Sequence, residues 1–205
     1  RSVTPIGRLR PMIHLRGRTS DLVVDLSTGA PTIVHWGAPL PAPFEPAAID
    51  RPLVSGSADM VAPLSAVPEH GAGFTGRPGL LGHRRRGTAW APRFSPAGHA
   101  LDGSRLVVHT RDEVAGLALT VTFELDHALV ARAELTNEST DRYLLDALTV
   151  TLPVPQHAGE LGAFDGRWTR ELHPVRRQWP SGAHTVENRR GRTSHEHPPL
   201  VFAGT

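Results

Sequence analysis

Residues 116–135 read GLALTVTFELDHALVARAEL, and this stretch decides the class of fold. Apolar residues alternate with small or polar ones across Gly116–Leu125 and again across Ala128–Leu135. A period of two residues is typical of half-buried β-strands, because successive side chains point to opposite faces of a sheet. Asp126-His127 lies between the two runs, and Asp favours reversals of the chain. The stretch therefore predicts a β-hairpin with one apolar face.

Similar runs recur along the chain and indicate an all-β fold. Turn-forming residues separate them, for example Ser27–Ala30 and Asn137–Asp141. No segment keeps a helical period for more than two turns. We expect an all-β protein built as a sandwich of two large antiparallel sheets. The other strand-like runs are Asp21–Leu26, Thr32–Trp36, Ser104–Thr110 and Leu144–Pro153.

Two parts of the chain depart from this pattern. Residues 39–100 are rich in proline and glycine and show little alternation, so we expect long loops there. Residues 198–205 read PPLVFAGT, which begins a strand-like run and then stops. We therefore expect residues 1–11 to be an extension before Met12, and 12–205 to be one domain truncated from a longer protein.

The charge and composition exclude several classes of function. The chain has 205 residues, 22 basic residues that are all arginine, 20 acidic residues and a formal net charge of +2. The acids are interspersed with the arginines, whereas nucleic-acid binders gather basic residues on one element. The absence of cysteine excludes disulfides and thiolate chemistry. We recognise no secretion signal and no apolar run long enough to span a membrane, and expect a cytoplasmic protein.

Residues 187–199 read ENRRGRTSHEHPP and concentrate polar side chains. His195 and His197 alternate along the chain and could chelate a metal, but residues 198–205 contain no carboxylate to complete the site. Ser194 beside His195 suggests a hydrolase, but adjacent residues of an extended chain face opposite ways, and the chain has no G-x-S-x-G motif. We favour a polar loop before a strand, with no metal and no cofactor.

Residues 166–171 read GRWTRE and contain the best candidate binding residue. Trp168 lies between two arginines and an acid in a turn-rich region. Such a mixture suits a sugar site, because the apolar face of a sugar packs on an aromatic ring while polar groups bind its hydroxyls. The alternative is a partly buried core tryptophan. That alternative is favoured more strongly for Trp36, Trp90 and Trp179.

Together, five segments resemble the N-terminal domain of the bacterial α-galactosidases of glycoside hydrolase family 36. They occur in the family's order and at roughly its spacing, across nearly the whole chain. The last two are the most specific. The segments are IVHWG at Ile33–Gly37, AIDRP at Ala48–Pro52, PEHG…GRPG at Pro68–Gly79, GRWTRE at Gly166–Glu171 and ENRRGRTSHEHPP at Glu187–Pro199.

The resemblance implies a β-supersandwich that precedes a catalytic (β/α)₈ barrel in the same polypeptide. In that family two barrel aspartates perform the retaining hydrolysis of terminal α-D-galactosides, so this chain contains no catalytic residue. Trp168 would line the pocket, and Asp50 would reach it from a neighbouring subunit of a homotetramer. His195 and Arg190 would lie at its rim. No cofactor, metal, nucleic acid or membrane is implied.

The chain departs from the family pattern in the loop 68–79. Many relatives carry a tyrosine, an aspartate and an arginine there, whereas this chain has His70, Phe74 and Gly76. The family's substrate preference and the subunit contact of that loop therefore do not carry over to this chain from the resemblance. The alternative function is a stand-alone carbohydrate-binding β-sandwich without an attached catalytic domain.

Overall fold

The computed structural model describes residues 12–45, 64–155, 157–179, 182–188 and 196–204. These residues are almost entirely strand, turn and loop, with two short 3₁₀ turns at His70–Ala72 (η2) and Arg85–Gly87 (η3). The chain divides into two compact units, Arg1–Pro153 and Val154–Thr205, which we describe separately. Residues 1–11, the expected extension, lie outside the described residues.

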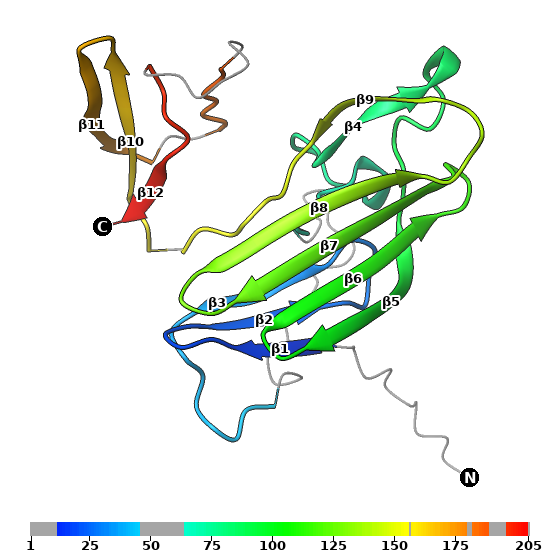
Figure 1. The fold of residues 1–205 in the computed structure, drawn as a ribbon, viewed down its shortest axis with the longest axis horizontal. Coiled ribbons are helices and arrows are strands. Elements are labelled where there is room, and N and C mark those ends of the chain that lie inside the picture. Colours follow the sequence, from blue (N-terminus) through cyan, green and yellow to red (C-terminus); the bar gives the residue numbers. More distant parts are fainter. Residues whose placement is uncertain (1–11, 46–63, 156, 180–181, 189–195, 205) are drawn as a thin grey trace. The chain divides into compact units, whose positions relative to one another are not determined.

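The first unit is a sandwich of antiparallel sheets (Figure 1). A three-stranded sheet has the order β1-β2-β3, a four-stranded sheet has the order β5-β6-β7-β8, and β4 pairs with β9. The all-β sandwich predicted from the sequence is therefore confirmed. The strands are β1 Met12–Arg16, β2 Asp21–Asp25, β3 Thr32–Gly37, β4 Leu80–Arg84, β5 Ser95–Asp102, β6 Arg105–Asp112, β7 Leu117–Leu125, β8 Leu129–Asn137 and β9 Tyr143–Leu148.

The apolar faces of the two larger sheets form one core. Leu117, Leu119, Val121, Phe123 and Leu125 of β7 are all buried, as the alternation of the opening stretch predicts. The same cluster includes buried leucines and valines of β1, β2 and β6. Burying one such side chain contributes about 1.5–3 kcal/mol. Alternation therefore identifies both the hairpin β7–β8 and the face that holds the sandwich together.

Two strands lie where the sequence predicts loops. β4 falls inside residues 39–100 and β5 begins inside them. β5 reads SPAGHALD, with all eight residues exposed. A strand exposed on both faces has no apolar alternation, so its sequence carries no period of two. Pro96 and Gly98 flank a register shift at this edge of the sheet, where both residues are tolerated.

Arg84 holds two connections of the first unit together. Its guanidinium donates to the carbonyl oxygens of Ala115, Gly116 and Asp141, and to the Asn137 side chain. These acceptors lie in the β6–β7 connection and around the β8–β9 connection. The planar fork of arginine suits such a task, because it presents five fixed donors. The first arginine of the run 84–86 is therefore structural.

The second unit is a three-stranded antiparallel sheet with β10 in the middle. Phe202 of β12 packs edge-on against Phe164 and lies directly across from Gly162. A Cβ at Gly162 would come within 1.8 Å of the Phe202 ring, so only glycine fits at this position. β12 confirms the strand expected near the end of the chain. The strands are β10 Glu160–Arg167, β11 Arg170–Gln178 and β12 Val201–Gly204.

Candidate functional site

Trp168 lies at the tip of the hairpin β10–β11. Arg167 pairs with Arg170, so Trp168 and Thr169 form the connecting loop. Thr169 has a φ of 69°, a left-handed conformation that β-branched residues rarely adopt. Its N–H donates to Oε1 of Glu171 at 3.0 Å, which stabilises the turn locally. The GRWTRE motif therefore forms a tight turn that presents its tryptophan at the end of a two-stranded ribbon.

The Trp168 side chain is 76% exposed. This excludes a core position in the described fold. Large aromatic rings at exposed positions are typical of binding surfaces. The geometry thus favours the platform interpretation of this residue over the core alternative.

For the other tryptophans the sequence favours a partly buried core position, and none of the three is fully buried. Trp90 is 62% exposed, Trp179 43% and Trp36 39%. The chain builds its cores from leucine, valine and phenylalanine instead. Residue type predicts burial only on average, and tryptophan is often left at surfaces that bind something.

A β-bulge lies directly below the tip of the hairpin. The register shift places Glu171 and Leu172 of β11 opposite Gly166 of β10, and Leu172 has a φ of 56°. The N–H of Gly166 donates to the carbonyl oxygen of Glu196 at 2.9 Å. Bulges turn the strand that carries them and redirect side chains. Here the bulge lies between Asp165 and Arg167, next to the loop that contains Trp168.

The end of the ENRRGRTSHEHPP segment lies along this same part of β10. His197 Nδ1 lies 3.1 Å from Oδ1 of Asp165, and the two side chains are 44% and 43% exposed. Among the described residues, no group of three or more His, Asp or Glu side chains is placed to hold a metal. His197 is engaged with a carboxylate of the hairpin.

Three predicted site residues lie outside the described residues. They are Asp50, Arg190 and His195, and Ser194 lies outside as well. Trp168 is thus the one candidate substrate-binding residue whose surroundings the structure describes. Sequence reasoning missed Asp165 and His197 as a pair, because a separation of 32 residues gives no signal of contact.

The loop 68–79 contains the departures from the family pattern, and the structure relates two of them. A Cβ at Gly76 would lie 2.8 Å from ring atoms of Phe74, so the Phe74 ring occupies the space beside residue 76. His70 Nδ1 hydrogen-bonds the Phe74 carbonyl oxygen at 2.9 Å, and its ring lies 6.0 Å from that of Trp90. The two departures are therefore linked, because the Phe74 ring fills the space that a side chain at residue 76 would need.

Glu69 anchors this loop from inside the first unit. Its carboxylate is buried and accepts hydrogen bonds from the N–H groups of Ala30 at 2.9 Å and Phe94 at 2.7 Å. Burial raises the pKa of Glu69 above its ordinary value, although the two N–H groups act in the opposite direction. Glu69 therefore joins three segments of the first unit, and its carboxylate is buried away from any substrate.

Asp21 is a second buried carboxylate, with the opposite shift. It accepts from the N–H of Leu40 at 3.0 Å and lies 2.8 Å from His14 Nε2. Burial alone would raise the pKa of Asp21, but the Leu40 and His14 hydrogen bonds and the nearby positive charges hold the pKa below its ordinary value. The His14 ring also packs edge-on against Phe44 at 5.4 Å.

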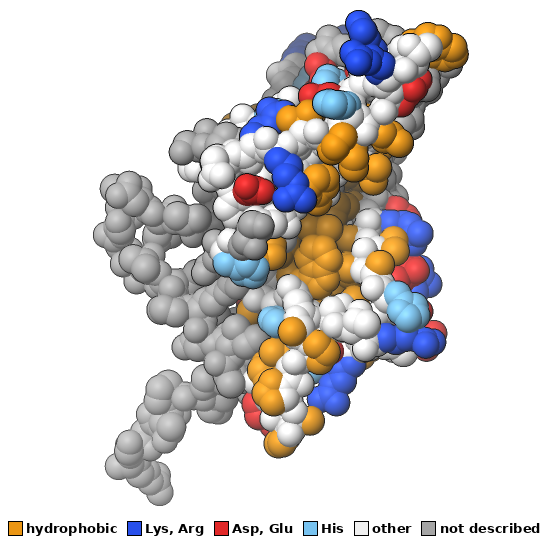
Figure 2. Space-filling model, turned by 90° about the vertical axis from the view of Figure 1, so that its left-hand side faces the viewer, with side chains coloured by type: hydrophobic (Ala, Val, Ile, Leu, Met, Phe, Trp, Pro, Cys, Tyr) orange, Lys and Arg blue, Asp and Glu red, His pale blue; other side chains and the backbone are white. Residues whose placement is uncertain are grey.

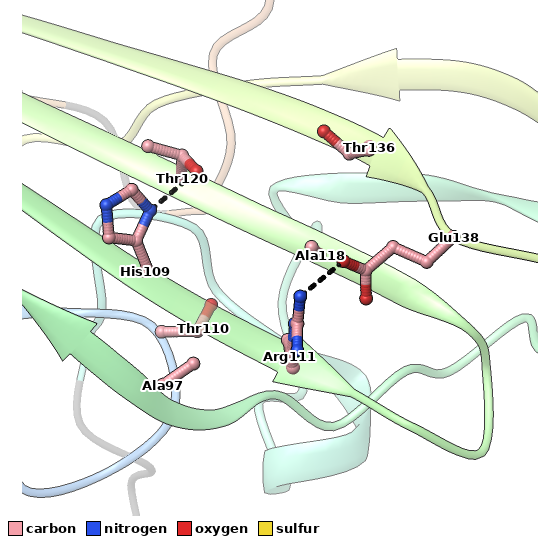
Figure 3. Close-up of a pocket in the computed structure, with 8 residues that line it drawn as sticks. All are labelled: Ala97, His109, Thr110, Arg111, Ala118, Thr120, Thr136 and Glu138. Atoms are coloured by element: carbon pink, nitrogen blue, oxygen red, sulfur yellow. Dashed lines mark hydrogen bonds and ion pairs between the residues drawn. The ribbon is translucent and has the colours of Figure 1, made fainter.

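A hollow of about 400 Å³ lies on the four-stranded sheet (Figure 3). His109 and Thr120 are 3.2 Å apart across β6 and β7, and Arg111 pairs with Glu138 at 2.8 Å. Ala97, Ala118 and Thr136 complete much of its lining. These side chains satisfy one another, and no Phe, Tyr or Trp ring lines the hollow. We interpret it as a solvated surface of the sheet.

The charge distribution agrees with the sequence. Arginine and acidic side chains are interspersed on the face shown in Figure 2, without a single basic patch. Such a pattern does not favour a nucleic-acid-binding surface. Within the part of the chain that the structure describes, no helix is long and apolar enough to cross a membrane.

Comparisons with known proteins identify the family. Residues 29–205 match the Glycosyl hydrolase family 36 N-terminal domain. An alpha-galactosidase of Escherichia coli is 37% identical over 196 residues, which cover 94% of this chain and 27% of that protein. The chain belongs to the family of glycosyl hydrolase family 36 N-terminal domains.

Solved structures show the same fold at lower identity. The GH36 alpha-galactosidase AgaA of Geobacillus stearothermophilus, as a variant in complex with raffinose, matches with a TM-score of 0.77 at 20% identity. The match covers 94% of this chain and 31% of that one. AgaB of the same organism matches with a TM-score of 0.74 at 18% identity. The chain thus spans about a third or less of the relatives it matches.

Proposed function

We propose that this chain is the non-catalytic N-terminal domain of an α-galactosidase. The observation that carries the proposal is the 37% identity to the E. coli alpha-galactosidase over 94% of the chain. The complete enzyme would remove terminal α-D-galactose with retention, using two carboxyl groups of its barrel about 5 Å apart. Those residues would lie in the part of the enzyme that this chain does not include.

The contribution of this domain to the reaction is binding energy. Trp168 would form one wall of the substrate pocket, where its exposed ring stacks on a sugar face. Such contacts use groups that do not react, and they orient the substrate for groups that do. The exposed hairpin tip supports this role, because it presents an aromatic ring beyond the edge of the sheet.

Subunit contacts belong to the same proposal. Asp50 would reach the pocket of a neighbouring subunit in a homotetramer and accept hydrogen bonds from sugar hydroxyls. Arg190 and His195 would lie at the rim. Sedimentation of the full-length enzyme and the kinetics of Asp50→Ala test these roles. A monomeric enzyme, or wild-type kcat/KM in that variant, would contradict them.

Cell fractionation tests the expected cytoplasmic location.

The experiment that tests the non-catalytic role uses the 205-residue chain itself. Incubated with a chromogenic α-galactoside, it should release no product above the blank. Hydrolysis at enzyme-like rates would place catalytic groups in this chain and overturn the proposal.

Calorimetry with galactose and raffinose distinguishes the alternative function. We expect no measurable affinity, because one pocket wall gives too few contacts to offset the cost of binding. A clear binding isotherm would favour a stand-alone carbohydrate-binding module instead.

A further inference from the structure

We propose that Asp165 and His197 form a brace that positions Trp168. The brace consists of the His197–Asp165 hydrogen bond at 3.1 Å and the Gly166–Glu196 backbone hydrogen bond at 2.9 Å. It joins two segments that lie far apart in the sequence. The inference rests on the proposed function, because it assigns residues that hold the pocket wall in place.

The need for a brace follows from the backbone at the tip. Thr169 and Leu172 both have positive φ values, 69° and 56°. Branched side chains avoid this region, and such conformations persist only where surrounding contacts determine them. The bulge also interrupts regular pairing between β10 and β11 directly below Trp168. The hairpin ladder by itself therefore gives the tip little rigidity.

Support for β10 comes instead from its other edge, which pairs with β12 and lies opposite the edge that pairs with β11. Regular pairing with β12 ends at Ala163 and Val201. Beyond that point the chain continues beside β10, and Glu196 accepts from Gly166 while His197 contacts Asp165. These two contacts flank the bulge, at adjacent residues of β10. They hold Asp165 and Gly166 of β10, three and two residues before the tryptophan, next to the interruption in the pairing with β11.

The exposure of the pair distinguishes positioning from stabilisation. Both side chains are almost half exposed, and solvent-exposed ion pairs contribute little to global stability. Loss of the His197 side chain should therefore leave the fold intact and loosen the hairpin tip. If the pair served only the stability of the fold, loss of the His197 side chain would destabilise the fold and would not loosen the hairpin tip in particular.

NMR of the 205-residue chain tests the brace independently of catalysis. In His197→Ala we expect faster exchange of the Gly166 N–H, by about tenfold, and a lower heteronuclear NOE for the Trp168 indole N–H. The global unfolding midpoint should stay close to wild type. Asp165→Ala should give the same result. His197→Asn keeps a side-chain donor and should restore part of the order, whereas His184→Ala, at another exposed histidine of the same unit, should change nothing.

Kinetics of the full-length enzyme add a measurement that a purely structural role of the pair would not change. His197→Ala should lower kcat/KM by about threefold to tenfold, and by nothing further when Trp168 is already alanine. Unchanged Gly166 exchange and Trp168 dynamics in both His197→Ala and Asp165→Ala would overturn the brace. Equal kinetic losses in the presence and absence of Trp168 would also overturn it. If Trp168→Ala alone has wild-type kinetics, the pocket role fails while the NMR result still decides the brace.

Discussion

The two units each contain a histidine–aspartate pair, and the surroundings of the pairs differ. His14 and Asp21 lie 2.8 Å apart with side chains 11% and 4% exposed. His197 and Asp165 lie 3.1 Å apart with side chains nearly half exposed. The first pair is buried and contacts Leu40 and Phe44, and burial makes unpaired polar groups costly. The second pair lies beside a hairpin tip, where its role is to orient Trp168. The same chemistry thus serves stability in one unit and presentation of a ring in the other.

The largest effect should follow from emptying the core of the first unit. Phe123 is fully buried, and Phe123→Ala should cost about 3–5 kcal/mol of unfolding free energy. Phe202→Ala in the second unit should cost much less, because that ring is 37% exposed. Urea denaturation of both variants measures the difference. Equal losses would contradict the contrast between the two units.

Breaking the buried pair should have the next largest effect. Asp21→Ala leaves the Leu40 N–H and the His14 ring without their acceptor and should cost about 1.5–3 kcal/mol at neutral pH.

The pH dependence of this loss has a defined sign. Since the pKa of Asp21 is lowered in the fold, its stabilisation is present above the unfolded value of 3.8 and is lost as pH falls through the folded value. The stability gap between wild type and Asp21→Asn should therefore shrink below about pH 4. A gap that stays constant down to pH 2 would show that the charge of Asp21 contributes nothing.

Glu69 should behave in the opposite way, with a smaller effect. Glu69→Gln keeps one oxygen acceptor for the two N–H groups and should cost about 1 kcal/mol. Because the pKa of Glu69 is raised, wild type is favoured most below the ordinary value of 4.5 and loses that advantage as pH rises through the folded value. Chemical denaturation between pH 3 and pH 8 measures this. An advantage that grows with pH would contradict it.

The smallest effect on stability should come from the exposed pair. Asp165→Ala should change the unfolding free energy by about 0–1 kcal/mol. The same denaturation experiments provide the measurement, with Asp21→Ala as the reference. A loss as large as that of Asp21→Ala would mean that both pairs serve stability, and the contrast between them would disappear.

The sequence predicted many of the strands of the first unit. β2, β3, β6, β7, β8 and β9 all match predicted runs, and the alternation in β7 identifies the buried residues one by one. β4, β5, β10 and β11 match none of the predicted runs. β5 and β11 are exposed along almost their whole length, so they have no apolar period and tolerate Pro96 and Pro174. Apolar alternation therefore predicts a strand best where one face is fully buried, as in β7.

The sequence predicted which residue and which motif form the candidate site, but not the contacts that hold that residue in place. The GRWTRE turn indicated Trp168, whereas its exposure depends on a bulge that no spacing reveals. His197 appeared in the sequence as one of two equivalent histidines, and only the fold pairs it with Asp165. The exposure of Trp90 likewise depends on the path of a loop. The fold of the chain, and not the local sequence, decides all three outcomes.

The kinetics of Trp168→Ala in the full-length enzyme test the central claim most directly, with Trp179→Ala as the matched control. Trp179 belongs to the same unit and follows β11 at the end away from the tip. We expect Trp168→Ala to lower kcat/KM by about 5- to 150-fold, equivalent to about 1–3 kcal/mol of lost transition-state binding, while Trp179→Ala stays near wild type. Wild-type kcat/KM in Trp168→Ala would contradict the account, because the exposed ring would then have no part in binding the substrate.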